Sequence, residues 1–430
     1  MARLVAHVRE APPLPGVRVV VDVRPMQEPE HAPLTAEYLE RLLRAFAAEP
    51  LAGESFVIVS RALRPDPADS LAAAGLPVAG HRRMPPTGRV FRSAGLTVDS
   101  FLLRGAEIGT ASAEVDRKSV FHTAGGAVPL ASGLPIVATL LDLAPWDLPA
   151  VYAASPAARF GHRLRARVLR DATRVIVCSR ATAEAARRRL HLPAERLVVV
   201  PLAVDESYRA AGRDVELGST VRDRLGLPPR YLAFAGRYDA RKDMRTLFRA
   251  LVHIRDQAAG TSRPTRRRAG TGNGAGAPLP TLVFALADNG PDERSAVAAA
   301  VERSGVAEMV RVVAPADQRE RAAIVAGAEA FVYPCLSEAT ALPALEALSV
   351  GVPVIGSRAG AMPEAVGSAG IVVEPRDPAR MAAAIEALWS GGALAKQLRR
   401  QAHRRAETDT RSWSDVAFET RRVYAEAIDA

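Results

Sequence analysis

The chain has 430 residues, which is too long for one hydrophobic core and predicts two domains of about 200 residues each. Its 57 Lys and Arg residues outnumber its 47 Asp and Glu residues, and the resulting charge of +10 favours phosphates, acidic lipid headgroups or nucleic acid as partners. We expect no nucleic-acid partner, because no aromatic residues alternate with the basic ones to stack bases and no helix-turn-helix, zinc or RNA-binding motif occurs.

The first half of the chain alternates short apolar strands with helical patterns. Residues 1–16 contain three prolines and predict a loose lead-in. A helix is predicted at 35–48, and strands are predicted at 17–23, 55–60, 119–122, 135–139, 174–178 and 197–200. Alternating apolar strands and helices indicate a parallel sheet covered on both faces, so residues 17–204 predict a Rossmann-like domain.

Residues 205–410 repeat this rhythm and predict a second Rossmann-like domain. Its predicted strands lie at 231–235, 281–285, 310–313, 330–333, 352–355 and 370–373. Glycine, proline and arginine dominate residues 257–280, which cannot bury a core and are expected to form a disordered basic loop. Residues 411–430 predict a C-terminal helix. The fold class is therefore α/β with two domains.

The most informative stretch runs from Phe331 to Ser357. A buried strand is followed by a loop with Glu338, and then by a helix in which Pro343 suits the first position, because its missing N–H would have no partner there. Glu346 lies one turn inside this helix. N–H groups at a helix start favour an anion such as phosphate, while flanking carboxylates accept hydrogen bonds from hydroxyls. A sugar nucleotide presents both kinds of group.

A second block, from Tyr231 to Asp243, runs from a strand through Gly236 and Arg237 into a basic loop with Lys242. The two glutamates spaced eight apart in Ser-Glu-x-x-x-Leu-Pro-x-x-Glu, together with this block, resemble the retaining glycosyltransferases of family 4. The resemblance covers nearly the whole chain. It implies the GT-B fold, in which two Rossmann-like domains face a central cleft and the C-terminal helix at 411–430 packs back on the first domain.

The resemblance also implies roles for individual residues. Arg237 and Lys242 would hold the donor diphosphate, Glu338 would contact hydroxyls of the donor sugar, and Glu346 would contact the ribose. Catalytic roles are expected for Glu338, Arg237 and Lys242. The donor-binding set is Gly236, Arg237, Lys242, Glu338, Thr340, Ala341, Leu342, Pro343 and Glu346. The alternatives are surface salt bridges for Arg237, Lys242 and Glu338 and an exposed helix position for Glu346.

Three departures from the family pattern fall on the expected cleft. Ala339 and Ala341 replace two glycines, and the added methyl groups are tolerated easily only where φ is negative. Leu141 stands in place of the histidine of the family's Thr-x-His-Asp, and leucine cannot hydrogen-bond a sugar. The glycine-rich loop expected after the first strand is replaced by residues 32–38.

Three further residues are candidates for lining the cleft. His122 ends a strand and matches a histidine that the family often has, although a core histidine fits the sequence equally well. Asp142 remains from the Thr-x-His-Asp motif. Ala314 lies in the turn where the family binds the base, and the adjacent Pro315 removes a backbone donor.

The resemblance implies a retaining hexosyltransferase with a nucleoside diphosphate sugar as donor and a glycan or lipid-linked acceptor, and we expect no metal or other cofactor. The alternatives are a catalytically degenerate GT-B scaffold or regulatory subunit and, on the same fold, an epimerase or phosphorylase. Two cysteines in separate domains and no apolar run of about 18 residues favour a cytoplasmic protein. The arginine-rich segment 159–170 fits either a helix face exposed to solvent or peripheral contact with the inner face of an anionic membrane.

Overall fold

The computed structural model describes residues 16–85, 98, 100, 102–103, 118–261, 278–286 and 291–430. The predicted lead-in at 1–16, except Gly16, and residues 262–277 of the predicted basic loop lie outside these residues. The prediction of a disordered loop was wrong for residues 257–261, which continue the helix α10 Met244–Thr261. The chain divides into two compact units. The N-terminal unit combines the described residues up to Ala203 with Ser412–Ala430, and the C-terminal unit spans Val204–Arg411.

The sheet of the N-terminal unit contains, in the part of the chain described, seven parallel strands in the order β3-β2-β1-β4-β5-β6-β7. The strands are β1 Arg18–Asp22, β2 Ser55–Arg61, β3 Val78–Met84, β4 Ser119–Ala124, β5 Ile136–Leu140, β6 Arg174–Val177 and β7 Leu197–Val199. Its helices are η1 Arg24–Gln27, α1 Pro33–Ala48, α2 Pro67–Ala73, α4 Ala144–Asp147, α5 Pro149–Tyr152, α6 Pro156–Asp171, α7 Arg180–Leu190, η3 Ala194–Arg196 and α17 Trp413–Ile428.

Strand β3 is not among the strands predicted from the sequence. It lies at one edge of the sheet and is paired only with β2 among the described strands. His81, Arg82 and Arg83 are exposed on it. Charged side chains are common on edge strands because they oppose pairing with other chains, and they also remove the apolar pattern that identifies a buried strand.

The C-terminal unit repeats the architecture. Its sheet, counted over the described residues, has six parallel strands in the order β10-β9-β8-β11-β12-β13. The strands are β8 Leu232–Gly236, β9 Leu282–Leu286, β10 Val310–Val313, β11 Ala330–Tyr333, β12 Val354–Ser357 and β13 Gly370–Val373. The helices are α8 Glu206–Arg213, α9 Val215–Leu225, α10 Met244–Thr261, α11 Pro291–Ser304, η4 Ala307–Met309, α12 Gln318–Ala326, α13 Leu342–Ser349, α14 Met362–Val366, α15 Pro378–Trp389 and α16 Ala393–Thr408.

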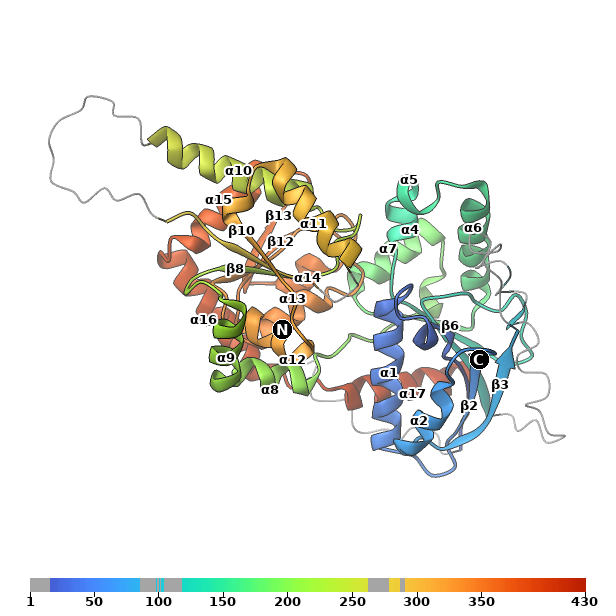
Figure 1. The fold of residues 1–430 in the computed structure, drawn as a ribbon. Helices are drawn as coiled ribbons and strands as arrows, with labels where there is room; N and C mark the ends of the chain where they lie inside the picture. The colour runs from blue at the N-terminus through green and yellow to red at the C-terminus, as the bar shows by residue number, and fades with distance from the viewer. Residues whose placement is uncertain are drawn as a thin grey trace, which may run out of the picture. The chain divides into compact units, whose positions relative to one another are not determined.

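Both units therefore consist of a parallel sheet with helices on its two faces, as Figure 1 shows. The predicted α/β class with two Rossmann-like domains is confirmed. Aromatic side chains fill the centre of the second sheet, where Phe234, Phe284, Phe331 and Tyr333 pack ring against ring. Such packing makes the strand ends around Tyr333 a rigid support for the loops that follow them.

Helix α17 belongs to the N-terminal unit and lies beside α1 (Figure 1). Arg421 donates to both carboxylate oxygens of Glu54, at 2.8 and 2.7 Å, and both side chains are buried. The Tyr424 hydroxyl lies 2.6 Å from Nδ1 of His122 on β4. These long-range contacts attach the last residues of the chain to the first sheet. None of the described helices has the length and apolarity that a membrane-crossing segment needs.

Candidate functional site

Two loops meet where the neighbouring strands β8 and β11 end. The loop after β8 leads to α10, and the loop after β11 leads to α13. Lys242 and Cys335 form a β-bridge between the loops, and the N–H of Leu336 donates to the carbonyl of Arg241 at 2.7 Å. The two blocks identified in the sequence are thereby joined at the carboxyl ends of the strands. This is where ligands of open α/β sheets bind.

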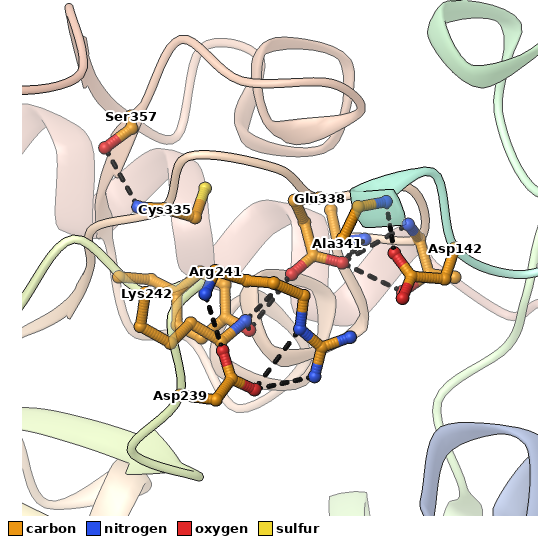
Figure 2. Close-up of polar contacts among 11 residues, drawn as sticks. Asp142, Asp239, Arg241, Lys242, Cys335, Glu338, Ala341 and Ser357 are labelled. Carbon is orange, nitrogen blue, oxygen red and sulfur yellow. Dashed lines mark hydrogen bonds and ion pairs between the residues drawn. The ribbon is translucent and has the colours of Figure 1, made fainter. Parts of the chain in front are cut away.

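Lys242 and Glu338 form a buried ion pair at this junction. Lys242 Nζ lies 3.1 Å from Oε2 of Glu338, and the two side chains are 7% and 9% exposed. Tyr333 completes the cluster: its hydroxyl donates to the same oxygen at 3.0 Å, and its ring lies 4.1 Å from Nζ. Lys242 also donates to the Tyr333 hydroxyl. Figure 2 shows Lys242 and Glu338 pointing toward one another from the two loops.

The other oxygen of Glu338 is held by the loop that follows. Oε1 accepts from the N–H of Ala341 at 3.1 Å, from the N–H of Thr340 at 3.3 Å and from the Thr340 hydroxyl at 3.2 Å. Donors thus surround both oxygens, and the carboxylate has a single orientation. A surface salt bridge of the exposed kind, the alternative for Lys242 and Glu338, does not describe this buried cluster.

Nearby cations keep Glu338 charged. Burial by itself would raise the pKa of Glu338, but Lys242 and Arg241 outweigh it and lower the pKa to about 2. The pKa of Asp239 results from the same two opposing effects. Burial acts to raise this pKa, and hydrogen bonds from Arg241, the nearest at 2.7 Å, lower it below its usual range. Burial raises the pKa of the Cys335 thiol to about 12, so this cysteine is an inert core residue.

Ala341 has a left-handed backbone conformation, with φ 54° and ψ 25°. It caps the N-terminus of α13, and its side chain is fully buried. The left-handed conformation destabilises the fold by about 1–2 kcal/mol when the residue is alanine rather than glycine. Of the two alanines that replace family glycines, Ala341 therefore lies where φ is positive. Because Ala341 ends the loop, α13 begins at Leu342, and the prediction that Pro343 is the first helical residue was wrong by one position.

Gly360 packs against the backbone of Glu338, and it was not among the site residues predicted from the sequence. The N–H of Ala361 donates to the Glu338 carbonyl at 2.8 Å. A Cβ built on Gly360, whose φ is 49°, would lie 1.9 Å from the same carbonyl oxygen. Only glycine allows this approach. The sole signal in the sequence is a glycine after β12, which does not reveal what it touches.

Glu346 is 6% exposed, so the alternative of an exposed helix position is wrong. Its carboxylate pairs with Arg321 of α12, whose Nη2 donates to Oε1 at 3.1 Å and to Oε2 at 3.3 Å. Helix α12 follows β10 and the turn that contains Ala314. Glu346 is thus paired with a residue of α12, the helix that follows the turn containing Ala314.

Arg237 follows Gly236 at the end of β8 and is partly buried. The side chains of Thr340, Leu342 and Pro343 lie along the loop and the first turn of α13, on the same segment as Glu338. The C-terminal unit therefore brings the proposed donor residues onto the ends of β8 and β11 and the start of α13.

The candidates in the N-terminal unit have different surroundings. His122 is fully buried, with Nε2 2.9 Å from the Thr139 hydroxyl and Nδ1 2.6 Å from the Tyr424 hydroxyl, which favours the core interpretation over a position in a cleft. Burial lowers its pKa to about 4. Asp142 precedes α4 by two positions and accepts from the N–H of Ala144, the first residue of this helix, at 2.8 Å. Leu141 is 1% exposed and packs in the core.

Comparison with known families gives two matches. Residues 35–208 match the family model described as Glycosyltransferase Family 4, and residues 229–391 match the model described as Glycosyl transferases group 1. Together the two matches include every residue predicted for the donor site.

Two curated proteins are similar over part of their length. A D-inositol 3-phosphate glycosyltransferase of Streptomyces bingchenggensis is 31% identical over 252 residues, which cover 52% of this chain and 51% of that protein. An MMP alpha-(1->4)-mannosyltransferase of Mycolicibacterium hassiacum is 35% identical over 150 residues, which cover 34% of this chain and 35% of that protein. The chain thus spans about a third to a half of the length of these relatives.

Solved structures resemble the chain over nearly its whole length. A sucrose-phosphate synthase from Thermosynechococcus elongatus has a TM-score of 0.67 at 19% identity and covers 95% of this chain, with 98% of its own chain matched. Anabaena HepE in complex with UDP-glucose has a TM-score of 0.62 at 15% identity and covers 96% of this chain, with 99% of its own matched. At such identities the likeness concerns the fold alone.

Proposed function

Since the chain belongs to glycosyltransferase family 4, as the sequence resemblance indicated, we propose that it transfers a hexose from a nucleoside diphosphate sugar to an acceptor hydroxyl. We propose further that the configuration of the sugar is retained, that no metal takes part, and that the acceptor is a glycan or is linked to a lipid. The names of the curated relatives add phosphorylated inositol to the acceptors worth testing.

The observation that carries the proposal is the buried pair of Lys242 and Glu338. A lysine ammonium has three N–H donors, and in this cluster Glu338 and Tyr333 take two of them. The third donor is suited to a phosphate oxygen of the donor, and Arg237 contributes a second cation at the end of β8. Glu338 is held as an anion, but its two oxygens already accept five hydrogen bonds, so a sugar hydroxyl would bind this carboxylate by taking the place of one of these donors, such as the Tyr333 hydroxyl. Glu346 would accept hydrogen bonds from the ribose.

We propose that the reaction has three steps. The glycosidic bond to the diphosphate breaks, and the negative charge that develops on the leaving oxygen is stabilised by Arg237, Lys242 and the N-terminus of α13. A phosphate oxygen of the departing group removes the proton of the acceptor hydroxyl on the same face of the sugar. The acceptor oxygen then bonds to the anomeric carbon on the face that the diphosphate left, which retains the configuration.

The second candidate is a scaffold that binds nucleotide without turnover. Leu141 favours it, because this residue is buried in the core of the N-terminal unit and offers no hydrogen bond where the family has a histidine. Nucleotide binding alone does not distinguish the two candidates, whereas turnover does.

Calorimetry with UDP, GDP and their hexose conjugates tests the proposal. We expect one nucleotide to bind, and Lys242→Ala to weaken it about 10–100-fold, because a charged hydrogen bond contributes about 1.5–3 kcal/mol. Arg245→Ala, which removes an exposed arginine of α10 near the same loop, is the matched control and should bind as the wild type does. Slow hydrolysis of the bound donor supports the transferase. Binding without hydrolysis or transfer supports the scaffold, and no binding to any nucleotide contradicts both.

We also propose that the N-terminal unit contacts anionic membrane surfaces from the cytoplasmic side. Arg159, Arg163 and Arg167 recur every four residues on α6 and are exposed, so they share one face of the helix. Phe160 beside them is 59% exposed, and Val151 of the preceding α5 is 52% exposed. Cations and exposed apolar side chains together suit the headgroup region of a bilayer.

A further inference from the structure

Arg165 of α6 is a buried cation that lacks an oxygen acceptor in the described part of the chain. It is 5% exposed, its Nε is buried, and no hydrogen bond or ion pair joins its guanidinium to a described residue. The other buried arginines of the described residues each lie 3.0 Å or less from a carboxylate or carbonyl oxygen; they are Arg24, Arg41, Arg209 and Arg421. Burying a guanidinium without such oxygens is unfavourable, so the fold alone does not account for Arg165.

Trp146 and Asp142 offset only part of this cost. The guanidinium carbon of Arg165 lies 5.3 Å from the centre of the Trp146 ring, which is a cation–π contact. Burial lowers the pKa of Arg165 to about 10, and the attraction of Asp142 acts against this effect. The side chain therefore remains charged at neutral pH. A guanidinium has five N–H donors, and an anion that binds here would supply the oxygens that they lack.

His162 adds a hydrogen-bond acceptor to the same face of α6. It lies one turn before Arg165, and its ring centre is 5.9 Å from that of Trp146. Nε2 lies 3.1 Å from the carbonyl oxygen of Tyr152, and because a carbonyl only accepts, this nitrogen carries the proton. Burial lowers the pKa of His162, so the ring is neutral at pH 7 and Nδ1 is an acceptor. Nδ1 is buried and has no hydrogen-bond partner among the described residues.

These side chains lie beside the carboxyl end of β5. Asp142 follows the last residue of this strand by two positions, and Trp146 lies on the short helix α4 that comes next. Ligands of open α/β sheets bind at such strand ends. The residues proposed for the donor diphosphate belong to the C-terminal unit, whereas this group belongs to the N-terminal unit. An anion held here is therefore a different substrate from the donor.

We propose that Arg165 and His162 form a binding site for an acidic acceptor. Arg165 binds a phosphate or carboxylate of the acceptor through paired N–H donors, and Nδ1 of His162 accepts a hydrogen bond from a neighbouring hydroxyl of the same molecule. Trp146 positions both side chains. The inference rests on the proposed function and names the class of its acceptor, which is a sugar or polyol that carries a phosphate or a carboxylate.

Calorimetry without nucleotide tests the site with glucose 6-phosphate, glucuronate and glucose. For the wild type we expect at least one of the two acids to bind about 10–100-fold more tightly than glucose, the size of one charged hydrogen bond. Binding of glucose 6-phosphate alone identifies the anion as phosphate, and binding of glucuronate alone identifies it as carboxylate. Arg165→Met should reduce the preference to about 1. Arg187→Gln, which removes an exposed arginine of α7, is the control and should keep it.

A second variant tests the role of the imidazole. His162→Phe keeps a ring against Trp146 but removes Nδ1, so it should weaken binding of the preferred acid about 2–10-fold. Inorganic phosphate has no neighbouring hydroxyl on a carbon, and its affinity should not change in this variant. Equal weakening of the acid and of inorganic phosphate would contradict the contact between His162 and a hydroxyl.

Thermal unfolding separates binding from a structural role. Because the charge of Arg165 is buried without hydrogen bonds, Arg165→Met should raise the melting temperature by about 2–4 °C while it abolishes the preference for acids. A lower melting temperature with the preference intact would show a structural arginine and overturn the inference. Arg165→Lys, which keeps the charge but not the planar fork, should retain a smaller preference and replaces Arg165→Met if that variant does not fold.

The failure of this inference is distinct from the failure of the proposed function. A wild type that binds nucleotide but binds both acids no more tightly than glucose overturns the acidic acceptor and leaves the transferase intact. A wild type that binds no nucleotide overturns the proposed function, and the assignment of this site to an acceptor falls with it.

Discussion

Replacing Gly360 by alanine should displace Glu338. The added Cβ would lie 1.9 Å from the Glu338 carbonyl oxygen and 2.9 Å from its carbonyl carbon. Because ordinary contacts begin at 3.4 Å, the two backbone segments must separate by about 1.5 Å. The strain of a left-handed alanine adds about 1–2 kcal/mol, and the overpacking adds about 1–3 kcal/mol.

Gly391 is a matched control for this substitution. Its φ is 68°, close to the 49° of Gly360, but no atom lies within 4 Å of the Cβ that alanine would add. Gly391→Ala therefore introduces the backbone strain without the collision. The difference between the two variants, about 1–3 kcal/mol, isolates the contact with Glu338.

The measurement has two parts. Thermal unfolding should show Gly360→Ala melting lower than Gly391→Ala by about 2–4 °C for each kcal/mol, the scale for a unit of about 200 residues. Calorimetry with the nucleotide sugar should show weaker binding for Gly360→Ala alone, because moving the Glu338 backbone also moves the carboxylate paired with Lys242. Equal melting temperatures and equal affinities for the two variants would refute the reasoning.

Two other predictions concern pH and membranes. His122 has a pKa of about 4 in the folded chain, against about 6.5 when unfolded, so the unfolded state takes up a proton first and stability falls as the pH drops from about 6.5 to 4, by about 3 kcal/mol. Thermal unfolding between pH 7 and 4.5 should show this decline, and His122→Gln should flatten it; a wild-type curve that is level over this range contradicts the assignment. Sedimentation with phosphatidylglycerol vesicles should show binding that the double variant Arg163→Ala/Arg167→Ala weakens about 10–30-fold, at about 1 kcal/mol for each arginine. Arg82→Ala, on the edge strand β3, is the control, and equal binding to phosphatidylcholine vesicles would contradict the proposal.

Local sequence patterns determined the architecture of this protein. Apolar segments such as those of β8 and β11, alternating with amphipathic helices, suffice for two parallel sheets, because burial on both faces leaves a continuous apolar run that needs no knowledge of the partner strand. The loop positions of Glu338 and Lys242 followed for the same reason, since ligands bind where such strands end.

Only the tertiary structure decided the environment of each side chain. The approach of Gly360 to Glu338 and the pairing of Glu346 with Arg321 join residues that are more than 20 positions apart in the chain. His122 has the same dependence: its second partner, Tyr424, lies 302 residues away, on a helix whose docking no local pattern reveals. Periodicity reports which face of an element is apolar, whereas hydrogen-bond partners and backbone clashes are set by packing between elements.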